Sequence, residues 1–201
     1  AMTEKQAKLC RSCLIEKDAN GICPACKTSG GITNPAPYLP VGTKIGNRYE
    51  LGRLVDFNGE GATYIGYDPV YDRRVLIREY LPEGICHRQG TTVVADAGND
   101  ANYKALLSDF CDLAKMVRRL DHIECLVKLL DLLEENNTCY AVYQSIEGVR
   151  LDQLLKRSKG RISYERALPL FLPLLYALRE IHTLGFLHRG ISLRTLYIEK
   201  S

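Results

Sequence analysis

The sequence predicts an α+β protein with a small cysteine-rich module in front of it. Three observations lead to this fold class. Short segments with strand character, bounded by turn residues, lie between residues 47 and 148. Two long segments have the apolar spacing of amphipathic helices. A polar segment with two pairs of cysteines precedes both kinds of segment.

Length and composition are those of an ordinary globular protein. The chain has 201 residues, of which 46% are hydrophobic and 25% charged, which suits one large or two small domains. A net charge of +3 does not argue for nucleic acid or a membrane surface as partner. No apolar run approaches the roughly 20 residues that span a bilayer, and the polar start has no signal-peptide core. We therefore expect a cytoplasmic protein.

The N-terminal cysteines form two C-x-x-C pairs, Cys10 with Cys13 and Cys23 with Cys26. A C-x-x-C turn directs two thiolates at one point, so two such turns supply the four sulfur ligands of a tetrahedral Zn²⁺ ion. Residues 1–27 resemble a zinc ribbon, and four cysteine ligands indicate a structural rather than a catalytic ion. A module of this size has too little core to fold without its metal.

Other readings of these cysteines stay open. Two disulfides or four idle thiols would need the same residues, but a reducing compartment disfavours disulfides. Iron accepts the same four ligands as zinc. The remaining cysteines stand singly among apolar neighbours, as small buried side chains would: Cys86, Cys111, Cys125 and Cys139.

Residues 28–46 are expected to form a linker. The segment is rich in Thr, Ser, Gly and Asn, and Pro35, Pro37 and Pro40 stand close together. Proline clusters stiffen such segments without giving them regular structure.

Strands are predicted on both sides of a helix. Leu51 to Asp68 reads as a strand, a glycine-containing turn and a second strand, and Arg74 to Gly84 adds a third. Leu126 to Leu133 and Thr138 to Ile146 are predicted to pair as a hairpin around the turn at residues 134–137.

Helices are predicted at Asp100 to Leu120 and Glu165 to Gly185. The first has one apolar stripe: Tyr103, Leu106, Leu107, Phe110, Ala114, Val117 and Leu120. The second is dense in leucine, with Ser163 as the expected cap and Pro173 as the expected kink. A short helix is expected to begin at Leu151.

The segment from Gly185 to Ile198 contains His188-Arg189 and resembles the catalytic loop of protein kinases, H-R-D followed by Lys and Asn. The predicted strands and helices stand in the order of this family, and residues 39–201 are most similar to bacterial serine/threonine kinases that carry an N-terminal zinc ribbon. The resemblance implies a small lobe over residues 47–148, with a five-stranded antiparallel sheet and helix αC. It implies the start of the helical large lobe over residues 149–201, with αD, αE and the catalytic loop.

The resemblance also assigns the nucleotide pocket. The three glycines of the phosphate loop correspond to Asp56, Asn58 and Gly61, with Gly59 beside them. The strand-three lysine of V-A-I-K corresponds to Arg78, a planar guanidinium in place of a compact ammonium. The gatekeeper and hinge positions correspond to Tyr143, Gln144 and Ile146.

The catalytic groups of the family are missing at these positions. The αC glutamate is Leu113, and the neighbouring Asp112 lies about 100° round the helix, so it would substitute only if the helix rotated. The catalytic Asp is Gly190, the following Lys is Ser192, and the metal-binding Asn is Thr195. The resemblance therefore implies a pseudokinase, for which ATP and Mg²⁺ are doubtful cofactors.

Three functions stay open. The first is an inactive kinase-like scaffold that binds or regulates a protein partner. The second is an active or atypical kinase completed by sequence beyond residue 201. The third is a module that senses a nucleotide without transferring phosphate. We also expect self-association through Phe171 to Leu184, because the large-lobe helices that cover αE in the family are absent from these 201 residues.

Overall fold

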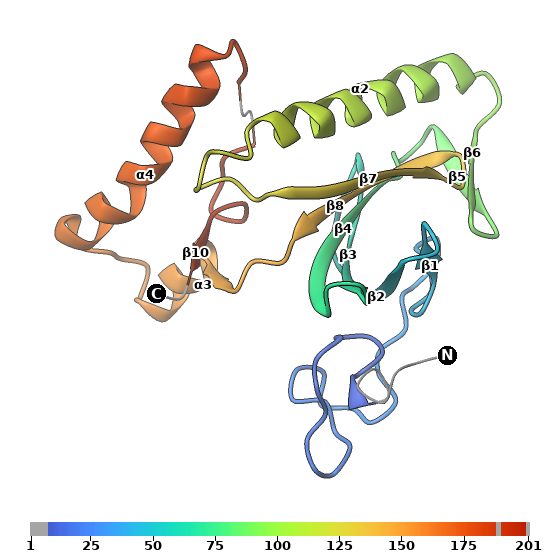
Figure 1. The fold of residues 1–201 in the computed structure, drawn as a ribbon, viewed down its shortest axis with the longest axis horizontal. Coiled ribbons are helices and arrows are strands. Elements are labelled where there is room, and N and C mark those ends of the chain that lie inside the picture. Colours follow the sequence, from blue (N-terminus) through green and yellow to red (C-terminus); the bar gives the residue numbers. More distant parts are fainter. Residues whose placement is uncertain (1–7, 188–189, 200–201) are drawn as a thin grey trace. The chain divides into compact units, whose positions relative to one another are not determined.

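The computed structural model describes residues 8–187 and 190–199. The chain divides into two compact units (Figure 1). The first unit contains residues 1–118 and 129–144, and the second contains residues 119–128 and 145–201.

A six-stranded sheet forms the centre of the first unit, in the order β1-β2-β3-β4-β8-β7. All neighbouring strands are antiparallel. The five predicted strands are present, and the two-residue strand β1 adds a sixth at the edge. The bounds are β1 Lys44–Ile45, β2 Tyr49–Asn58, β3 Gly61–Asp68, β4 Arg73–Tyr80, β7 Leu129–Glu135 and β8 Thr138–Gln144.

The β7–β8 hairpin turns at Asn136 and Asn137, both of which have positive φ angles, 56° and 57°. Two left-handed residues make the tight turn whose twist matches that of paired strands, and asparagine tolerates this conformation. Strand β7 therefore continues to Glu135, two residues past its predicted end, whereas it begins at Leu129 rather than at Leu126.

The segment predicted as a linker is partly packed onto this sheet. Leu39 and Ile45 are fully buried in a core with residues of β2, β3, β4 and β8. The Asn34 side chain donates to the carbonyls of Leu39 and Gly52, at 2.8 and 3.1 Å. Its oxygen accepts from the Leu54 amide at 2.7 Å. The composition of this segment could not reveal these contacts, because they join it to distant residues.

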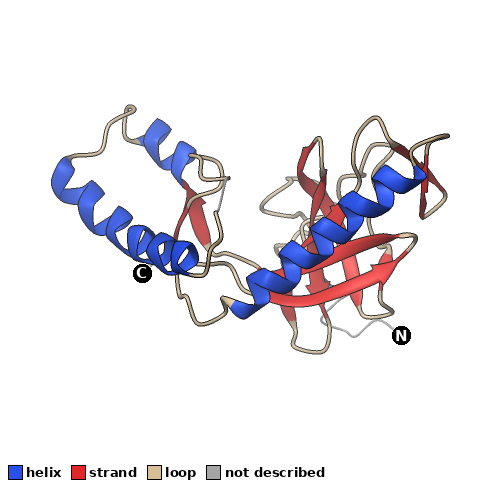
Figure 2. Cartoon of the chain, turned by 90° about the horizontal axis from the view of Figure 1, so that it is seen from above, coloured by secondary structure: helices blue, strands red, loops and turns tan. Residues whose placement is uncertain are grey.

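Helix α2, Asp100–Arg119, packs against β7 and β8 within the first unit (Figure 2). Its bounds agree with the prediction to within one residue. Tyr103 and Ala114 are buried, but Leu106 is 41% exposed although it belongs to the predicted apolar stripe. The sequence analysis did not identify the short hairpin of β5, Cys86–Gln89, and β6, Thr92–Ala95.

The four single cysteines differ in burial. Cys111 and Cys139 are buried and Cys86 is half-buried, but Cys125 is exposed. The expectation of burial is wrong for Cys125, because this residue lies in the irregular segment between α2 and β7.

The second unit contains helix α3, Leu151–Arg157, helix α4, Tyr164–Thr183, and a two-stranded ladder of β9, Gly148–Arg150, with β10, Tyr197–Glu199. Ser163 occupies the N-cap of α4 but makes no side-chain capping bond. Ala177 and Ile181 of α4 pack against Leu120 and Ile123. Within the described part of the chain, no helix is long and apolar enough to cross a membrane.

Candidate functional site

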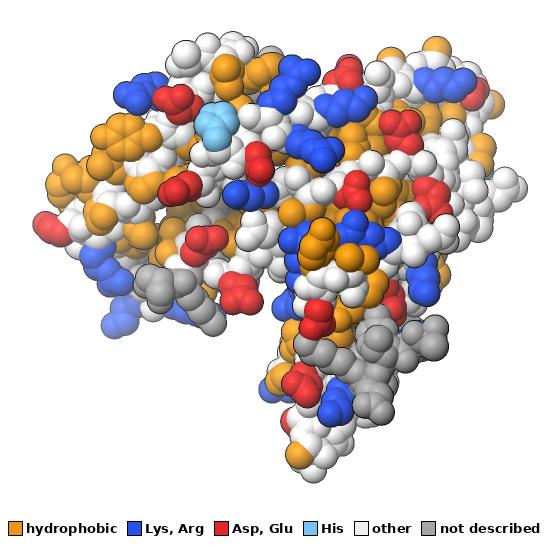
Figure 3. Space-filling model, viewed as in Figure 1, with side chains coloured by type: hydrophobic (Ala, Val, Ile, Leu, Met, Phe, Trp, Pro, Cys, Tyr) orange, Lys and Arg blue, Asp and Glu red, His pale blue; other side chains and the backbone are white. Residues whose placement is uncertain are grey.

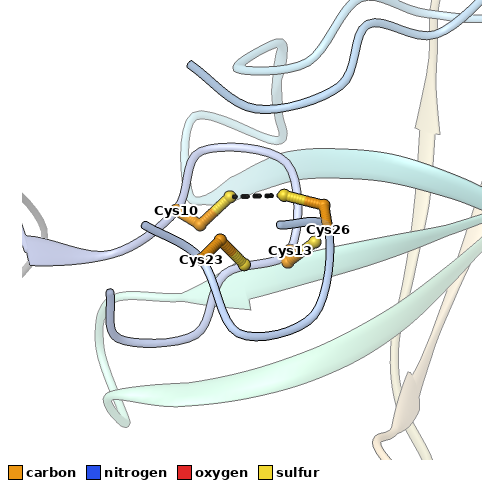
Figure 4. A group of neighbouring side chains, drawn as sticks. All are labelled: Cys10, Cys13, Cys23 and Cys26. Atoms are coloured by element: carbon orange, nitrogen blue, oxygen red, sulfur yellow. Dashed lines mark hydrogen bonds between the residues drawn. The ribbon is translucent and has the colours of Figure 1, made fainter. Parts of the chain in front are cut away.

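The four N-terminal cysteines converge on one point (Figure 4). Their sulfur atoms all lie within 4.8 Å of one another, and those of Cys10 and Cys26 are 3.7 Å apart. Zn–S bonds of about 2.3 Å at tetrahedral angles separate sulfur atoms by about 3.8 Å, so the cluster matches the size of a four-sulfur site. All eight cysteines of the chain are free thiols. The cluster could therefore hold a metal ion.

Two similar turns build the cluster. After each C-x-x-C pair the next residue, Leu14 or Lys27, has a positive φ, 53° or 59°. Its amide donates back to the carbonyl of the first cysteine, at 2.7 Å to Cys10 and 2.8 Å to Cys23. The same local geometry thus brings both thiols of each pair to the same side. Between the pairs, the Asp18 carboxylate accepts from the amides of two following residues and closes the connecting turn.

The environments of the thiols differ. The Thr28 hydroxyl lies 3.2 Å from the Cys26 sulfur and lowers the pKa of that thiol to about 6. Burial raises the pKa of Cys13 to about 12. A bound cation favours the thiolate at all four positions, because the thiolate is the form that coordinates a metal.

The turn between β2 and β3 corresponds to the phosphate loop. The Asn58 side-chain oxygen accepts from the amides of Glu60 and Gly61, both at 3.1 Å, and so closes this turn on itself. A Cβ atom on Gly61 would lie 2.1 Å from the Glu79 carbonyl oxygen, whereas Gly59 has open space. The retained glycine is thus needed for the close approach of two strands.

Arg78, at the position of the family's lysine, is held by this turn and by β3. Its guanidinium donates to the Asn58 side-chain oxygen at 3.0 Å and to the Thr63 hydroxyl at 3.3 Å. The Glu60 carboxylate lies 3.8 Å away. The Arg78 side chain is 23% exposed. The cation that would meet nucleotide phosphates therefore has polar partners inside the chain.

Strand register places several of the positions that the resemblance assigned to the nucleotide pocket on one face of the sheet. Asp56 stands opposite Thr63, and Thr63 stands opposite Arg78, so the three side chains share a face. Two residues before Arg78, Leu76 stands opposite Tyr143 on the same face. Burial raises the pKa of Tyr143, and the charge of Arg78 acts against this shift.

Leu76 shares this face with Arg78 and Tyr143, and the sequence analysis did not name it. The family pattern V-A-I-K has alanine there, so comparison of the tetrapeptide Val75-Leu-Ile-Arg78 with that pattern would have found it. The two bulky side chains of Leu76 and Tyr143 occupy the part of the face next to the hinge.

The αC position has no acidic partner for Arg78. Leu113 is 58% exposed. Asp112 lies 3.8 Å from Lys115 on the same helix, and its side chain is 70% exposed. The rotation of the helix that would bring Asp112 to Arg78 is not present. At the hinge, Gln144 ends β8 opposite Val75. Ile146 belongs to the second unit.

The segment that corresponds to the catalytic loop bonds to its own backbone. The Thr195 hydroxyl donates to the Gly190 carbonyl at 2.7 Å and accepts from the Ser192 amide at 2.8 Å. The Ser192 hydroxyl accepts from the Arg194 amide at 3.2 Å. Gly190, Ser192 and Thr195 are all exposed. His188 and Arg189, on which the family resemblance partly depended, lie outside the described residues.

Comparison with known proteins supports the resemblance to bacterial serine/threonine kinases. The chain is 28% identical over 153 residues to the serine/threonine-protein kinase PksC of Streptomyces coelicolor, which covers 73% of this chain and 24% of that protein. It is 24% identical over 159 residues to PrkC of Bacillus subtilis, covering 79% and 22%. The chain is related to bacterial serine/threonine protein kinases. It spans about a quarter or less of the length of these curated relatives, and no family model matches it.

Solved structures give the same fold for this kinase-like chain. The structure of "PpkA-294 apo form" superposes with a TM-score of 0.74 and 28% identity, covering 82% of this chain and 59% of the other. The kinase domain of Mycobacterium tuberculosis PknI has a TM-score of 0.59 and 15% identity, covering 81% and 58%, and supports the fold alone.

Proposed function

We propose that this kinase-like chain is a pseudokinase that serves as a binding or regulatory scaffold for a protein partner. The observation that carries the proposal is that the Arg78 guanidinium already contacts polar groups of the chain itself. In phosphoryl transfer, the cation at this position neutralises phosphate charge. Here Asn58, Thr63 and Glu60 surround it. A nucleotide would have to displace these contacts.

The face around Arg78 is also unfavourable for phosphates. Glu60 places a carboxylate 3.8 Å from the guanidinium, and Asp56 adds another on the same face of the sheet, two strands away, where a triphosphate would bring several negative charges. Like charges at short range oppose binding. Leu76 and Tyr143 add bulk where the family has an alanine and a gatekeeper. Positioning and charge neutralisation, the two contributions on which phosphoryl transfer depends, are both weakened.

The catalytic-loop positions supply no replacement chemistry. Gly190 has no carboxylate to accept a proton from a substrate hydroxyl. The Thr195 hydroxyl, at the position of the metal-binding asparagine, already bonds to Gly190 and Ser192. A hydroxyl that donates within its own turn is a weaker Mg²⁺ ligand than a free amide oxygen.

We also propose that the ion held by the cysteine cluster is Zn²⁺. Four thiolates in two C-x-x-C turns are typical of structural zinc sites, and the sulfur separations fit tetrahedral geometry. Free thiols fit a reducing, cytoplasmic location. When bound, the ion would hold together a module that has little apolar core of its own.

Radiolabelled ATP with generic protein substrates, in the presence of Mg²⁺ or Mn²⁺, tests the proposal. We expect no incorporation above background for the wild-type chain. Gly190→Asp alone should not restore transfer either, because the metal ligand at Thr195 would still be missing. Incorporation by the wild-type chain that disappears in an Arg78→Ala variant would show that the chain is an active kinase.

One observation favours nucleotide sensing as a second candidate. Arg78 keeps a full positive charge on the face of the sheet that the phosphate loop covers, and its partner Glu60 has a side chain that is 84% exposed. A ligand phosphate could replace such an exposed partner. Binding of ATP without Mg²⁺, measured by calorimetry and lost in Arg78→Ala, would favour sensing over a purely protein-binding scaffold.

A further inference from the structure

The cysteine module, defined here as residues 8–32, packs onto the sheet of the kinase-like unit. Leu14, the residue after the first C-x-x-C pair, is 5% exposed and forms an apolar cluster with Ile65 and Tyr67 of β3. Leu9 packs against the same cluster. In Figure 1 the module, in blue, lies next to β2 and β3. The metal-binding turns thus contact the sheet directly.

Backbone contacts join the module to strand β2. The Arg53 amide donates to the Ser12 carbonyl at 2.7 Å. At the preceding position, a Cβ atom on Gly52 would lie 2.5 Å from the Ser12 oxygen and 3.1 Å from a Leu14 methyl group. Glycine is therefore required at residue 52 for the module to approach this closely.

The same part of β2 is irregular. The register between β2 and β3 shifts between Leu51 and Leu54, and again between Leu54 and Asp56. Within this irregular part, the Arg53 amide bonds to Ser12 and the Leu54 amide bonds to the Asn34 side chain. A buried backbone amide without a partner is costly. The N-terminal segment therefore supplies the partners that permit the bulge.

Ser12 connects this bulge to the metal cluster. It lies between Cys10 and Cys13, is fully buried, and its hydroxyl is 3.3 Å from the Cys10 sulfur. The same hydroxyl accepts from the Ile32 amide at 2.9 Å. The position of the Ser12 carbonyl is therefore fixed by the turn that would hold the ion.

We propose that metal loading of the cysteine cluster determines the conformation of strand β2 at its irregular part, between Leu51 and Asp56. The metal centre is then a structural part of the kinase-like unit rather than a separate module on a linker. This inference depends on metal binding by the cluster and holds whether or not the chain transfers phosphate.

Hydrogen–deuterium exchange of the full chain, with Zn²⁺ and after treatment with a chelator, tests the inference. Removal of the metal should raise exchange in peptides covering residues 50–58 by at least about tenfold, because the bulge loses its partners. Peptides covering the β7–β8 hairpin, residues 129–144, should change much less. Unchanged exchange at residues 50–58 after confirmed loss of metal would overturn the inference.

A pair of variants measured with metal bound separates the contact from general destabilisation. Gly52→Ala should raise exchange at residues 50–58 although the zinc content stays at one equivalent, because the added methyl group meets the Ser12 carbonyl. Gly30→Ala is the matched control, because its added methyl group has open space, and it should leave exchange at residues 50–58 unchanged. If chelation unfolds the whole chain, the two glycine variants provide the test instead. Equal exchange at residues 50–58 in both variants would refute the inference.

Discussion

The cysteine module and the segment at residues 190–199 differ in what their motif residues do. In the module, four side chains from two turns converge within 4.8 Å. In the catalytic-loop segment, the side chains at the motif positions bond to the backbone of their own turn, as Thr195 does with Gly190. The first region is arranged to hold a ligand, and the second is closed on itself.

This comparison shows that the backbone frame of the fold does not depend on the family's catalytic side chains. Strand β10 still pairs with β9, and the Leu151 amide still donates to the Leu196 carbonyl at 2.9 Å. Backbone pairing needs no particular side chain, so it does not depend on the side chains of Gly190, Ser192 and Thr195. A four-sulfur metal site needs all four ligands, and all four cysteines of this cluster are present and close together.

The largest effect is expected from Cys13→Ser. We predict that the wild-type chain binds about one equivalent of Zn²⁺ and that the variant loses it, because structural zinc sites depend on the full ligand set. Elemental analysis of chelator-free preparations measures both. The exposed single cysteine provides the control, since Cys125→Ser should keep the metal. Less than about half an equivalent of zinc or iron in the wild-type chain would contradict the prediction.

Alanine substitutions at the two glycines of the β2–β3 turn should differ clearly in their effect on the free energy of unfolding. Gly61→Ala places a methyl group against the Glu79 carbonyl and should lower the free energy of unfolding by on the order of 3 kcal/mol. Gly59→Ala meets no atom and should change it by less than about 1 kcal/mol. Chemical unfolding of both variants measures the difference. Equal stability would mean that Gly61 is retained for a ligand rather than for packing.

Each unit contains an Arg–Asp pair with two hydrogen bonds, and the two pairs should differ in strength. Arg48 and Asp68 are 2.7 Å apart, and the Asp68 side chain is fully buried. Arg150 and Asp152 are also 2.7 Å apart but both are partly exposed. Asp68→Asn should cost roughly 2–4 kcal/mol. Asp152→Asn should cost much less, because water screens that pair. Thermal unfolding of the two variants compares them.

The pH dependence gives an independent check on Asp68. Burial would raise the pKa of this carboxyl, but hydrogen bonds from Arg48 and the Val70 amide, with the Arg73 charge, leave it lowered. A lowered folded-state pKa stabilises the protein above the unfolded value of about 3.9, and this stability is lost as the pH falls further. The gap between wild type and Asp68→Asn should be constant from pH 7 to about 4 and shrink below that. A gap independent of pH would contradict the assignment.

The smallest effect is expected from self-association of the second unit. One stripe of α4 is exposed: Leu168, Leu172, Leu175 and Tyr176, at 41–57%. Figure 3 shows apolar side chains gathered where α4 lies in Figure 1. We propose that a second copy covers this stripe weakly, so that light scattering at micromolar concentration gives a mean mass above the monomer.

Substitutions on α4 test this contact. Leu175→Glu should restore the monomer mass, whereas Arg166→Glu, on the opposite side of the helix, should not. A clean monomer for the wild-type chain would count against the contact.

The sequence by itself predicted the convergence of the four N-terminal cysteines and the order of the strands and helices. These features depend on residue type, local spacing and short-range periodicity. Two C-x-x-C turns predict a cluster because each turn is local, and α2 follows from its apolar stripe.

Only the tertiary structure decided the partners of Arg78, the packing of Leu39 and Ile45, and the attachment of Ser12 to Arg53. Each joins residues that are distant in sequence, and no local pattern specifies which amide or carbonyl a polar group will meet. Residues 28–46 therefore resembled a linker, although much of this segment contacts the sheet. The physical reason is that local preferences select strands, helices and turns, whereas burial and long-range hydrogen bonds select their neighbours.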